Sequence, residues 1–369
     1  MRYLSNLVVL SLTCCLVITT AFAADNTAKS GTPAIPTLGM ILDASGIQIS
    51  GFVDTAYTYC STTGECAYRV EDTPRNSFNM QLVDLVVSKL PEEGFGTLVN
   101  LKVGPAADPN TQFGITQAYI QYALGPFTAL AGKFTNLAGA EAIESPANYN
   151  FSRGYLFVAS PNTHTGVRGV YAFSEQIKLA LGVNNGWDNV TDDNKEKTLE
   201  TSLTLTPREN LSVNLAYYSG KETVTAAAPP LPASTPATKT LADIVLTYSP
   251  TESLTIVLDY ARGSQKEGTP TLGTAKWNGL AAYANYKLNT QWRVAIRGES
   301  FDDKDGFVLQ SGPQKIREGT LTVAYMPSGN VELRSELRAD KSDKAVFLQS
   351  DGGAKKTQNS LALEAIYKF

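Results

Sequence analysis

Apolar and polar positions alternate along this chain from residue 47 to its last residue. The final ten residues show this most clearly, with one face formed by Leu361, Leu363, Ala365, Tyr367 and Phe369 and a largely polar face between them. A period of two is typical of a β-strand that lies between two different environments. The pattern therefore predicts an all-β protein.

The alternation predicts about sixteen strands, each near the length that crosses a membrane at a tilt. They are expected near 47–59, 77–89, 96–104, 114–124, 127–134, 163–174, 176–184, 197–206, 211–220, 240–249, 254–262, 275–288, 291–301, 315–326, 330–340 and 358–369. No helical crossover separates them. Sequential hairpins of this number favour one antiparallel, up-and-down barrel.

The connections between the expected strands alternate between long and short. Short ones such as 91–94, 207–210 and 327–329 are rich in the turn residues Pro, Gly, Asn and Ser, whereas 135–162 and 341–357 are long. Transmembrane barrels have short periplasmic turns and long outer loops. An even strand number also leaves both chain ends on the periplasmic side.

Strands that run into short turns repeatedly end in an aromatic residue. At one membrane interface such rings would form a girdle. The residues are Tyr122, Phe173, Tyr248, Tyr286, Tyr325, Tyr367 and Phe369. A terminal Phe also resembles the signal by which outer-membrane barrels are delivered to their assembly machinery, so that machinery is an expected partner of Phe369.

Two late strands carry the clearest charged faces. In 291–301 and 330–340, Arg and Glu alternate with apolar residues. A soluble sandwich would also alternate, so this pattern alone does not decide between the two folds. A barrel of sixteen strands, however, is too wide for side chains to fill. We therefore expect the charged faces to line a water-filled channel.

The N-terminal residues predict export. A charged start, a short apolar run and Ala21-Phe22-Ala23 indicate a signal peptide at 1–23, cleaved near Ala23. This leaves a periplasmic segment at 24–45 and a barrel at 46–369 in the outer membrane, with membrane lipid as a partner. The net charge of −4 gives no basic patch for nucleic acid.

The cysteines and the single histidine restrict the chemistry. Cys60 and Cys66 enclose five residues, and in an oxidising compartment we expect them to form a disulfide. With a single His in the chain, we expect no metal site, and no cofactor motif is present. No nucleophile elbow or comparable triad occurs. We therefore expect that the protein is not an enzyme.

The longest loop, 135–162, is unusually apolar for a solvated loop, and we expect it to fold into the lumen. Here the sequence resembles the OmpL-like family of bacterial β-barrel porins. The motifs are Ile41–Ile47, Gly51–Asp54, Lys133-Phe134, Leu137–Glu141, Asn150–Gly154 and His164–Arg168. The resemblance is strongest over 38–187 and implies a porin whose third outer loop bends inward.

Charges on this loop and on the wall are the candidate constriction. Opposed charges across a narrow aqueous gap make a transverse field that selects polar solutes. The candidates are Glu141, Glu144 and Arg153 on the loop and Lys133, Arg168, Lys178, Arg293 and Arg297 on the wall. In the simpler interpretation these charges pair with one another.

The sequence thus favours passive diffusion of small hydrophilic solutes and ions. Wide porins of this kind often resemble trimers, so a homotrimer is one candidate assembly, but the sequence leaves the oligomeric state open. The alternative is a non-conducting barrel with structural or adhesive surface loops. A lumen packed with its own salt bridges, or a plug formed by residues 37–45, would favour that alternative. The sequence does not specify the solute or the ion preference.

Overall fold

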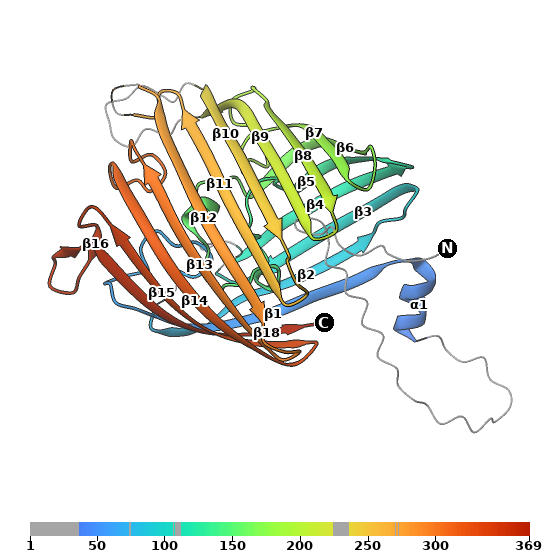
Figure 1. Ribbon diagram of the computed structural model, residues 1–369. Coiled ribbons are helices and arrows are strands. Elements are labelled where there is room, and N and C mark those ends of the chain that lie inside the picture. The colour runs from blue at the N-terminus through green and yellow to red at the C-terminus, as the bar shows by residue number, and fades with distance from the viewer. Residues whose placement is uncertain are drawn as a thin grey trace.

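The computed structural model describes residues 37–73, 75–105, 107, 112–223, 236–269, 271 and 273–369. They form one closed antiparallel barrel in which every strand pairs with its neighbours in the chain and the first pairs with the last (Figure 1). The predicted fold class is confirmed. The predicted signal peptide at 1–23, with its cleavage site, lies outside the described residues.

Sixteen strands make the wall. They are β1 (Gln48–Cys60), β2 (Ser77–Lys89), β3 (Gly94–Val103), β4 (Phe113–Leu124), β5 (Phe127–Thr135), β6 (Thr163–Ala172), β7 (Ile177–Asn184), β8 (Thr198–Arg208), β9 (Leu211–Thr223), β10 (Pro236–Tyr248), β11 (Leu254–Gln265), β12 (Ala275–Lys287), β13 (Trp292–Asp303), β14 (Gln314–Ser328), β15 (Val331–Ser342) and β18 (Thr357–Lys368). A small hairpin of β16 (Phe347–Leu348) and β17 (Ala354–Lys355) lies in the last long loop. The predicted boundaries agree to within four residues.

The barrel closes between β1 and β18. The amide of Gly51 donates to the carbonyl of Phe369 at 2.9 Å, and the amide of Phe369 donates back at 3.0 Å. The ring of Phe369 lies over Gly51, where an added Cβ would come within 2.8 Å of it. The lack of a side chain at Gly51 therefore leaves room for the ring of Phe369.

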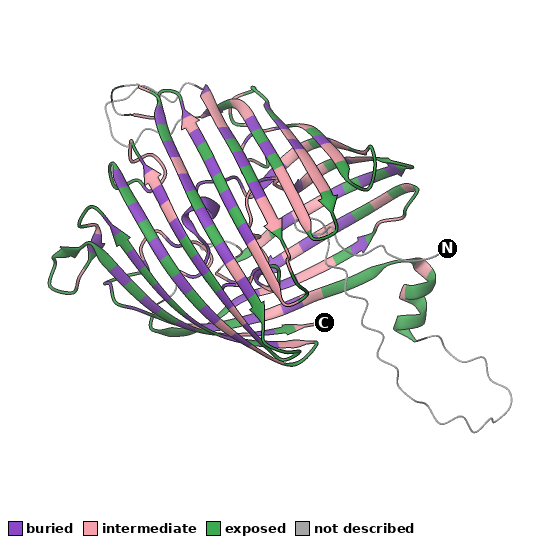
Figure 2. Ribbon diagram, viewed as in Figure 1, coloured by how far each residue is buried: buried purple, intermediate pink, exposed green. Residues whose placement is uncertain are grey.

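Exposed and buried residues alternate along most strands (Figure 2). Exposed apolar side chains such as Leu181, Leu258, Ile296 and Leu337 cover the outer face. The buried residues between them are largely polar or charged in β13 to β18. This is the reverse of a soluble protein and is typical of a barrel surrounded by lipid.

One helix precedes the barrel. Helix α1 (Leu38–Ser45) begins after the capping side chain of Thr37 and ends at Gly46, which has a φ of 69°. It lies outside the barrel and has no buried residue (Figure 1). Residues 37–45 therefore do not plug the lumen. No helix among the described residues is long and apolar enough to span a membrane.

Candidate pore constriction

The inner loop, residues 135–162, runs into the barrel from the end of β5 and returns to β6. It contains the short helices η1 (Ser145–Ala147) and α2 (Tyr155–Val158). All residues from 150 to 157 are buried, although no strand contains them. The loop was expected to fold into the lumen, and the structure places it there (Figure 1).

Carboxylates on the wall accept hydrogen bonds from backbone amides of the inner loop. Glu299 accepts from the amides of Tyr155 and Leu156, each at 2.7 Å. Glu336 accepts from the amides of residues 151 and 152 at 2.7 and 3.1 Å. Asp243 and Asp259 accept from those of residues 139 and 140 at 3.0 and 2.9 Å. Buried backbone amides need partners, so these four side chains fix the register of the loop.

Arginines on the wall donate to carbonyl groups of the same loop. Arg334 donates to the carbonyls of residues 145 and 148 at 3.2 and 2.9 Å. Arg338 donates to that of residue 153 at 2.6 Å, and Arg297 to that of residue 152 at 2.6 Å. The planar guanidinium suits this task because its several donors point in fixed directions. Amides of the loop are thus bound by acidic side chains of the wall, and its carbonyls by arginines.

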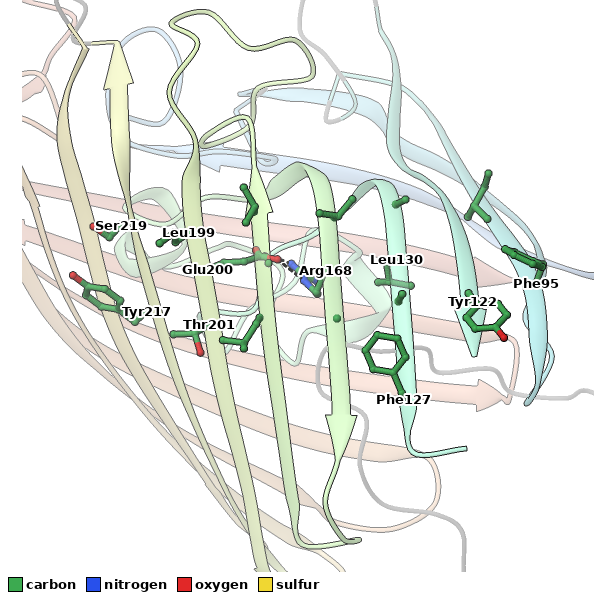
Figure 3. A pocket seen from close by; sticks show the side chains of 18 residues that line it. Phe95, Tyr122, Phe127, Leu130, Arg168, Leu199, Glu200, Thr201, Tyr217 and Ser219 are labelled. Atoms are coloured by element: carbon green, nitrogen blue, oxygen red, sulfur yellow. Dashed lines mark hydrogen bonds and ion pairs between the residues drawn. The ribbon is translucent and has the colours of Figure 1, made fainter. Parts of the chain in front are cut away.

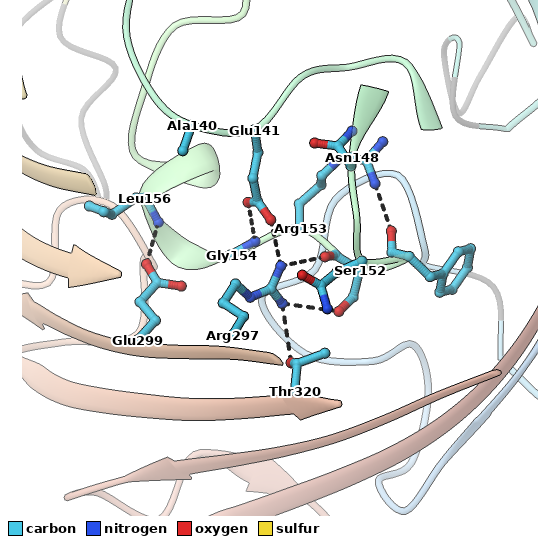
Figure 4. Close-up of polar contacts among 12 residues, drawn as sticks. Ala140, Glu141, Asn148, Ser152, Arg153, Gly154, Leu156, Arg297, Glu299 and Thr320 are labelled. Atoms are coloured by element: carbon cyan, nitrogen blue, oxygen red, sulfur yellow. Dashed lines mark hydrogen bonds and ion pairs between the residues drawn. The ribbon is translucent and has the colours of Figure 1, made fainter. Parts of the chain in front are cut away.

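Two of the predicted constriction residues meet at the centre of this network. The carboxylate of Glu141 lies 2.5 Å from Arg297 and also accepts from the amide of Gly154 at 2.7 Å (Figure 4). Arg297 is fully buried and also pairs with Glu318 at 2.8 Å. The predicted meeting of loop acid and wall base occurs here. The charges are buried against one another, however, and do not face an open gap.

The second loop carboxylate, Glu144, pairs with a residue that the sequence did not single out. Its partner is Lys102 on β3, at 3.2 Å, and Lys102 also lies 3.8 Å from Asp84. Burial is the largest single influence and raises the pKa of Glu144, but Lys102, a backbone hydrogen bond and Arg153 together lower it more, so the pKa lies below the usual value of 4.5. Because its side chain keeps 25% exposure, Glu144 is the loop acid that faces the remaining space.

The other predicted residues have different positions. Arg153 holds the loop together, since it donates to the carbonyls of residues 142, 143 and 151. Arg168 pairs with Glu200 at 2.6 Å and lies over the ring of residue 134. Arg293 pairs with Glu332 at 2.5 Å. Lys178 shares the inner side of β7 with the buried Ala180, away from the loop.

Lys133 was expected on the pore wall, and that placement is wrong. Its ammonium donates to the carbonyl of Ile115 at 2.6 Å on the outer side of the barrel. The inner side of β5 carries Leu130 and Phe134, which pack with Leu98 and Tyr119 in an apolar cluster. Because side chains alternate, an apolar inner face turns Lys133 outward.

Part of the lumen wall is apolar, which the sequence analysis did not anticipate. Tyr155, Leu156 and Ala159 of the inner loop pack on wall residues from β9 to β14, among them Tyr218 and Leu241. An added Cβ at Gly279 would lie 2.8 Å from Leu156, so this glycine lets the loop approach the wall. An apolar wall inside a barrel is stable here because the loop covers it.

A second outer loop also turns inward. Arg69 lies 2.5 Å from Asp72 and 3.6 Å from Asp340 on β15, and all three are buried. Sequence reasoning missed this pair, as it missed Lys102, Asp243 and Asp259. Lone carboxylates in the apolar strands 240–249 and 254–262 were the available signal for the last two.

The predicted disulfide is not formed in the structure. Cys60 and Cys66 are buried free thiols close enough to interact, and the Cys60 thiol is hydrogen-bonded to the hydroxyl of Thr62 at 3.3 Å. The thiols are thus adjacent at the start of the loop that carries Arg69. Their oxidation to a disulfide stays a prediction.

The outer side of the wall is hollowed across β3 to β9. A groove of about 750 Å³ lies there, and its lining is almost wholly apolar (Figure 3). Phe95, Tyr122 and Phe127 border one end and Tyr217 the other. Strands here are short, with nine residues in β5 and eight in β7, against fifteen in β14.

Solved outer-membrane proteins share this fold. The outer membrane channel DcaP of Acinetobacter baumannii is 16% identical, with a TM-score of 0.63 over 88% of this chain and 97% of that one. The trimer form of OmpT of Vibrio cholerae has a TM-score of 0.62 at 11% identity, covering 88% and 99%. An anion-selective porin from Comamonas acidovorans has 0.61 at 11% identity, covering 88% and 99%. No curated protein matches the sequence.

The family model "Putative beta-barrel porin-2, OmpL-like" matches residues 46–369, which is the whole barrel. The match covers β1 to β18 and the inner loop together. The family, the sixteen-stranded wall and the inward third loop agree with one another. The chain therefore belongs to the OmpL-like porins, and it is a porin of the outer membrane that forms a channel for passive diffusion.

Proposed function

We propose that small hydrophilic solutes pass this channel along the free edge of the inner loop. The observation that carries the proposal is the one-sided docking of that loop. Its hydrogen bonds to the wall go mainly to β9 to β15, whereas residues 139–144 keep partial exposure. The narrow section would then lie between this edge and the wall formed by β4 to β8, since Glu144 already contacts Lys102 on β3.

The charge of the interior supports a preference for cations. Among the described residues, fourteen Asp and Glu side chains are buried but only eight Lys and Arg side chains. These groups are buried, and they lie on the inner side of the strands or on loops that turn inward. An excess of one sign in a low-dielectric channel raises the local concentration of the opposite ion. Glu144, with its partial exposure, would contribute most directly.

Single-channel recording in a planar bilayer tests both parts. Stepwise conductance and a cation-favouring reversal potential under asymmetric salt are expected. In the variant Glu141→Gln/Glu144→Gln the reversal potential should shift toward anions, because Arg297 and Lys102 lose their loop partners. The control Glu92→Gln/Glu93→Gln removes the same charge from an exposed turn and should leave it unchanged.

Two outcomes would contradict the proposal. A folded, heat-modifiable barrel that never conducts would support the alternative, a structural or adhesive barrel. Unchanged ion preference in the loop variant would exclude these two carboxylates from the narrow section. In either case the loop would still be docked as described.

The proposed assembly is a homotrimer. The apolar groove across β3 to β9 lies on the side with the shortest strands, where a neighbouring protomer would shield the wall. One structural neighbour is described as a trimer. Cross-linking in native membranes tests this assembly. Delivery through Phe369, processing near Ala23 and the lack of enzymatic activity stay predictions, the second testable by sequencing the mature N-terminus.

A further inference from the structure

Two exposed cations lie side by side on the outer face, on neighbouring strands. Arg317 on β14 is directly opposite Lys341 on β15, and both side chains are exposed. Their neighbours along each strand, such as Glu318 and Asp340, are buried, so the two cations point away from the lumen. Like charges at directly opposed positions destabilise a sheet. An anion between them would remove that cost.

In the part of the chain that the structure describes, no side chain supplies this anion. Two other exposed lysines do have carboxylate partners, Lys197 with Asp192 and Lys221 with Glu196. Over the described ranges, neither Arg317 nor Lys341 lies within ion-pair distance of a carboxylate. The residues paired with these cations on the next strands form a row with them across the sheet. They carry hydroxyl groups: Ser300 on β13 is opposite Arg317, and Thr357 on β18 is opposite Lys341. Two cations between two hydroxyl groups suit a phosphate.

The next row toward the membrane consists of small residues. Gly298 is opposite Gly319, and Gly319 is opposite Ala339. An added Cβ at either glycine would meet nothing within 4 Å, and neither has a positive φ. Neither packing within the protein nor backbone conformation therefore requires glycine here. Glycine inside a strand often marks the close approach of a ligand.

Below the small residues lies a row of exposed apolar side chains. They are Ile296, Leu321, Leu337 and Leu361, with exposed fractions of 53%, 40%, 56% and 38%. Tyr325 of the periplasmic girdle is eight positions after Arg317 on the same strand. This step corresponds to about 20 Å across the membrane for a tilted strand. Since the apolar band of such barrels is about 25 Å tall, the cations lie near its outer edge, where their long side chains reach the outer-leaflet headgroups.

From these three rows we propose that β13, β14, β15 and β18 form a binding site for a phosphorylated lipid of the outer leaflet. Arg317 and Lys341 bind its phosphate, the hollow over Gly298 and Gly319 receives the neck of the headgroup, and the apolar row contacts the acyl chains. This site is independent of the proposed solute path, because it lies on the opposite side of the wall.

Lipid binding to the purified barrel in detergent micelles tests the site, with bisphosphorylated lipid A and its dephosphorylated form as probes and native mass spectrometry as the readout. The variant Arg317→Gln/Lys341→Gln should lose about tenfold or more in affinity for the phosphorylated probe, as expected for lost charge-assisted hydrogen bonds. Affinity for the dephosphorylated probe should stay unchanged.

A matched control pair lies near the same, outer-loop end of the barrel. Arg262→Gln/Lys276→Gln removes the same charge from exposed outward positions on β11 and β12 that have no glycine row beneath them. It should change affinity less than about twofold, within the usual effect of an exposed charge. Gly319→Leu keeps both cations but fills the hollow, and it should also weaken binding. Heat modifiability verifies that each variant is folded.

Three results would overturn the proposal. If Arg317→Gln/Lys341→Gln and the control Arg262→Gln/Lys276→Gln bound the phosphorylated lipid with equal affinity, the site would not depend on these two cations in particular. Inorganic phosphate that binds as tightly as the lipid would make this a site for free anions. Efficient cross-linking of Lys341→Cys between two copies in native membranes would make this face a protein interface.

Discussion

The two halves of the inner loop are held in the barrel by opposite kinds of surface. Residues 145–153 lie against β13 to β18, where arginines and Glu336 hydrogen-bond to the loop backbone, and Arg334 also forms a buried ion pair with Glu364 of the wall. Residues 155–159 lie against β9 to β14, where Leu156 and its neighbours pack on Tyr218 and Leu241. One sequence segment thus joins a charged wall to an apolar one.

The difference teaches what each wall contributes. Ionised side chains bind backbone groups in fixed directions, so the charged wall specifies the position of the loop, although burying such charges is costly. Apolar packing is non-directional, so the apolar wall stabilises the buried loop without fixing its exact position. On the apolar side, the position of the loop is fixed by Asp243, Asp259 and Glu299, which accept hydrogen bonds from its backbone amides.

Alternation predicted the charged half but not the apolar half. In 291–301 and 330–340, Arg and Glu identify the inner face unambiguously. In β9 to β11 both faces carry apolar residues, such as the inward Leu241 and the outward Ile244, so the pattern does not tell which faces the lumen. The same ambiguity in β5 placed Lys133 on the wrong side. Contacts between a loop and a distant strand leave no period in the sequence.

Replacing Arg334 by Met should have the largest effect, because it removes the charged wall's most connected residue. Arg334 pairs with Glu332 at 2.8 Å and Glu364 at 3.1 Å and also binds two loop carbonyls. Removing one partner of a buried ion pair costs about 3 to 5 kcal/mol. Urea unfolding in micelles measures it, with the exposed Arg262→Met as control. Similar unfolding free energies for both variants would contradict a specifying role for the charged wall.

Replacing Leu156 by Ala tests the apolar wall. Leu156 is 3% exposed, and truncating a buried leucine costs about 2 to 3 kcal/mol where the surroundings can partly collapse. Leu181→Ala, on the lipid-facing side, is the matched control. The same unfolding experiment applies.

The double variant Arg334→Met/Leu156→Ala sharpens the comparison. If the loop docks as one unit, either change releases part of both halves, and the double loss should be smaller than the sum. Strict additivity would mean that the two walls hold the loop independently.

The smallest effects concern two carboxyl groups near Lys102, whose pKa values shift in opposite directions. Burial raises the pKa of Glu71 above its usual 4.5, and Lys102 only partly offsets this. For Glu144 burial also raises the pKa, but the ion pair and hydrogen bond with Lys102, a backbone hydrogen bond and Arg153 together lower it below the usual value. The other charged groups that act on Glu71 are Arg153, Glu144 and Asp72. Opposite shifts predict opposite dependences of stability on pH.

At pH 7 Glu71→Gln should therefore stabilise the barrel by about 1 kcal/mol, since a charge that burial disfavours is removed. This gain should vanish as the pH falls below about 4.5, where Glu71 is protonated in both states. Glu144→Gln should cost about 1 kcal/mol at pH 7, because the Lys102 ion pair is lost, and this loss should disappear only below the lowered pKa of Glu144. Urea unfolding across this pH range measures both, with Glu92→Gln on an exposed turn as control. If both variants changed the unfolding free energy with the same sign, the opposite pKa shifts of Glu71 and Glu144 would be contradicted. Lys102 would then act on the inner loop and on the first outer loop in the same way.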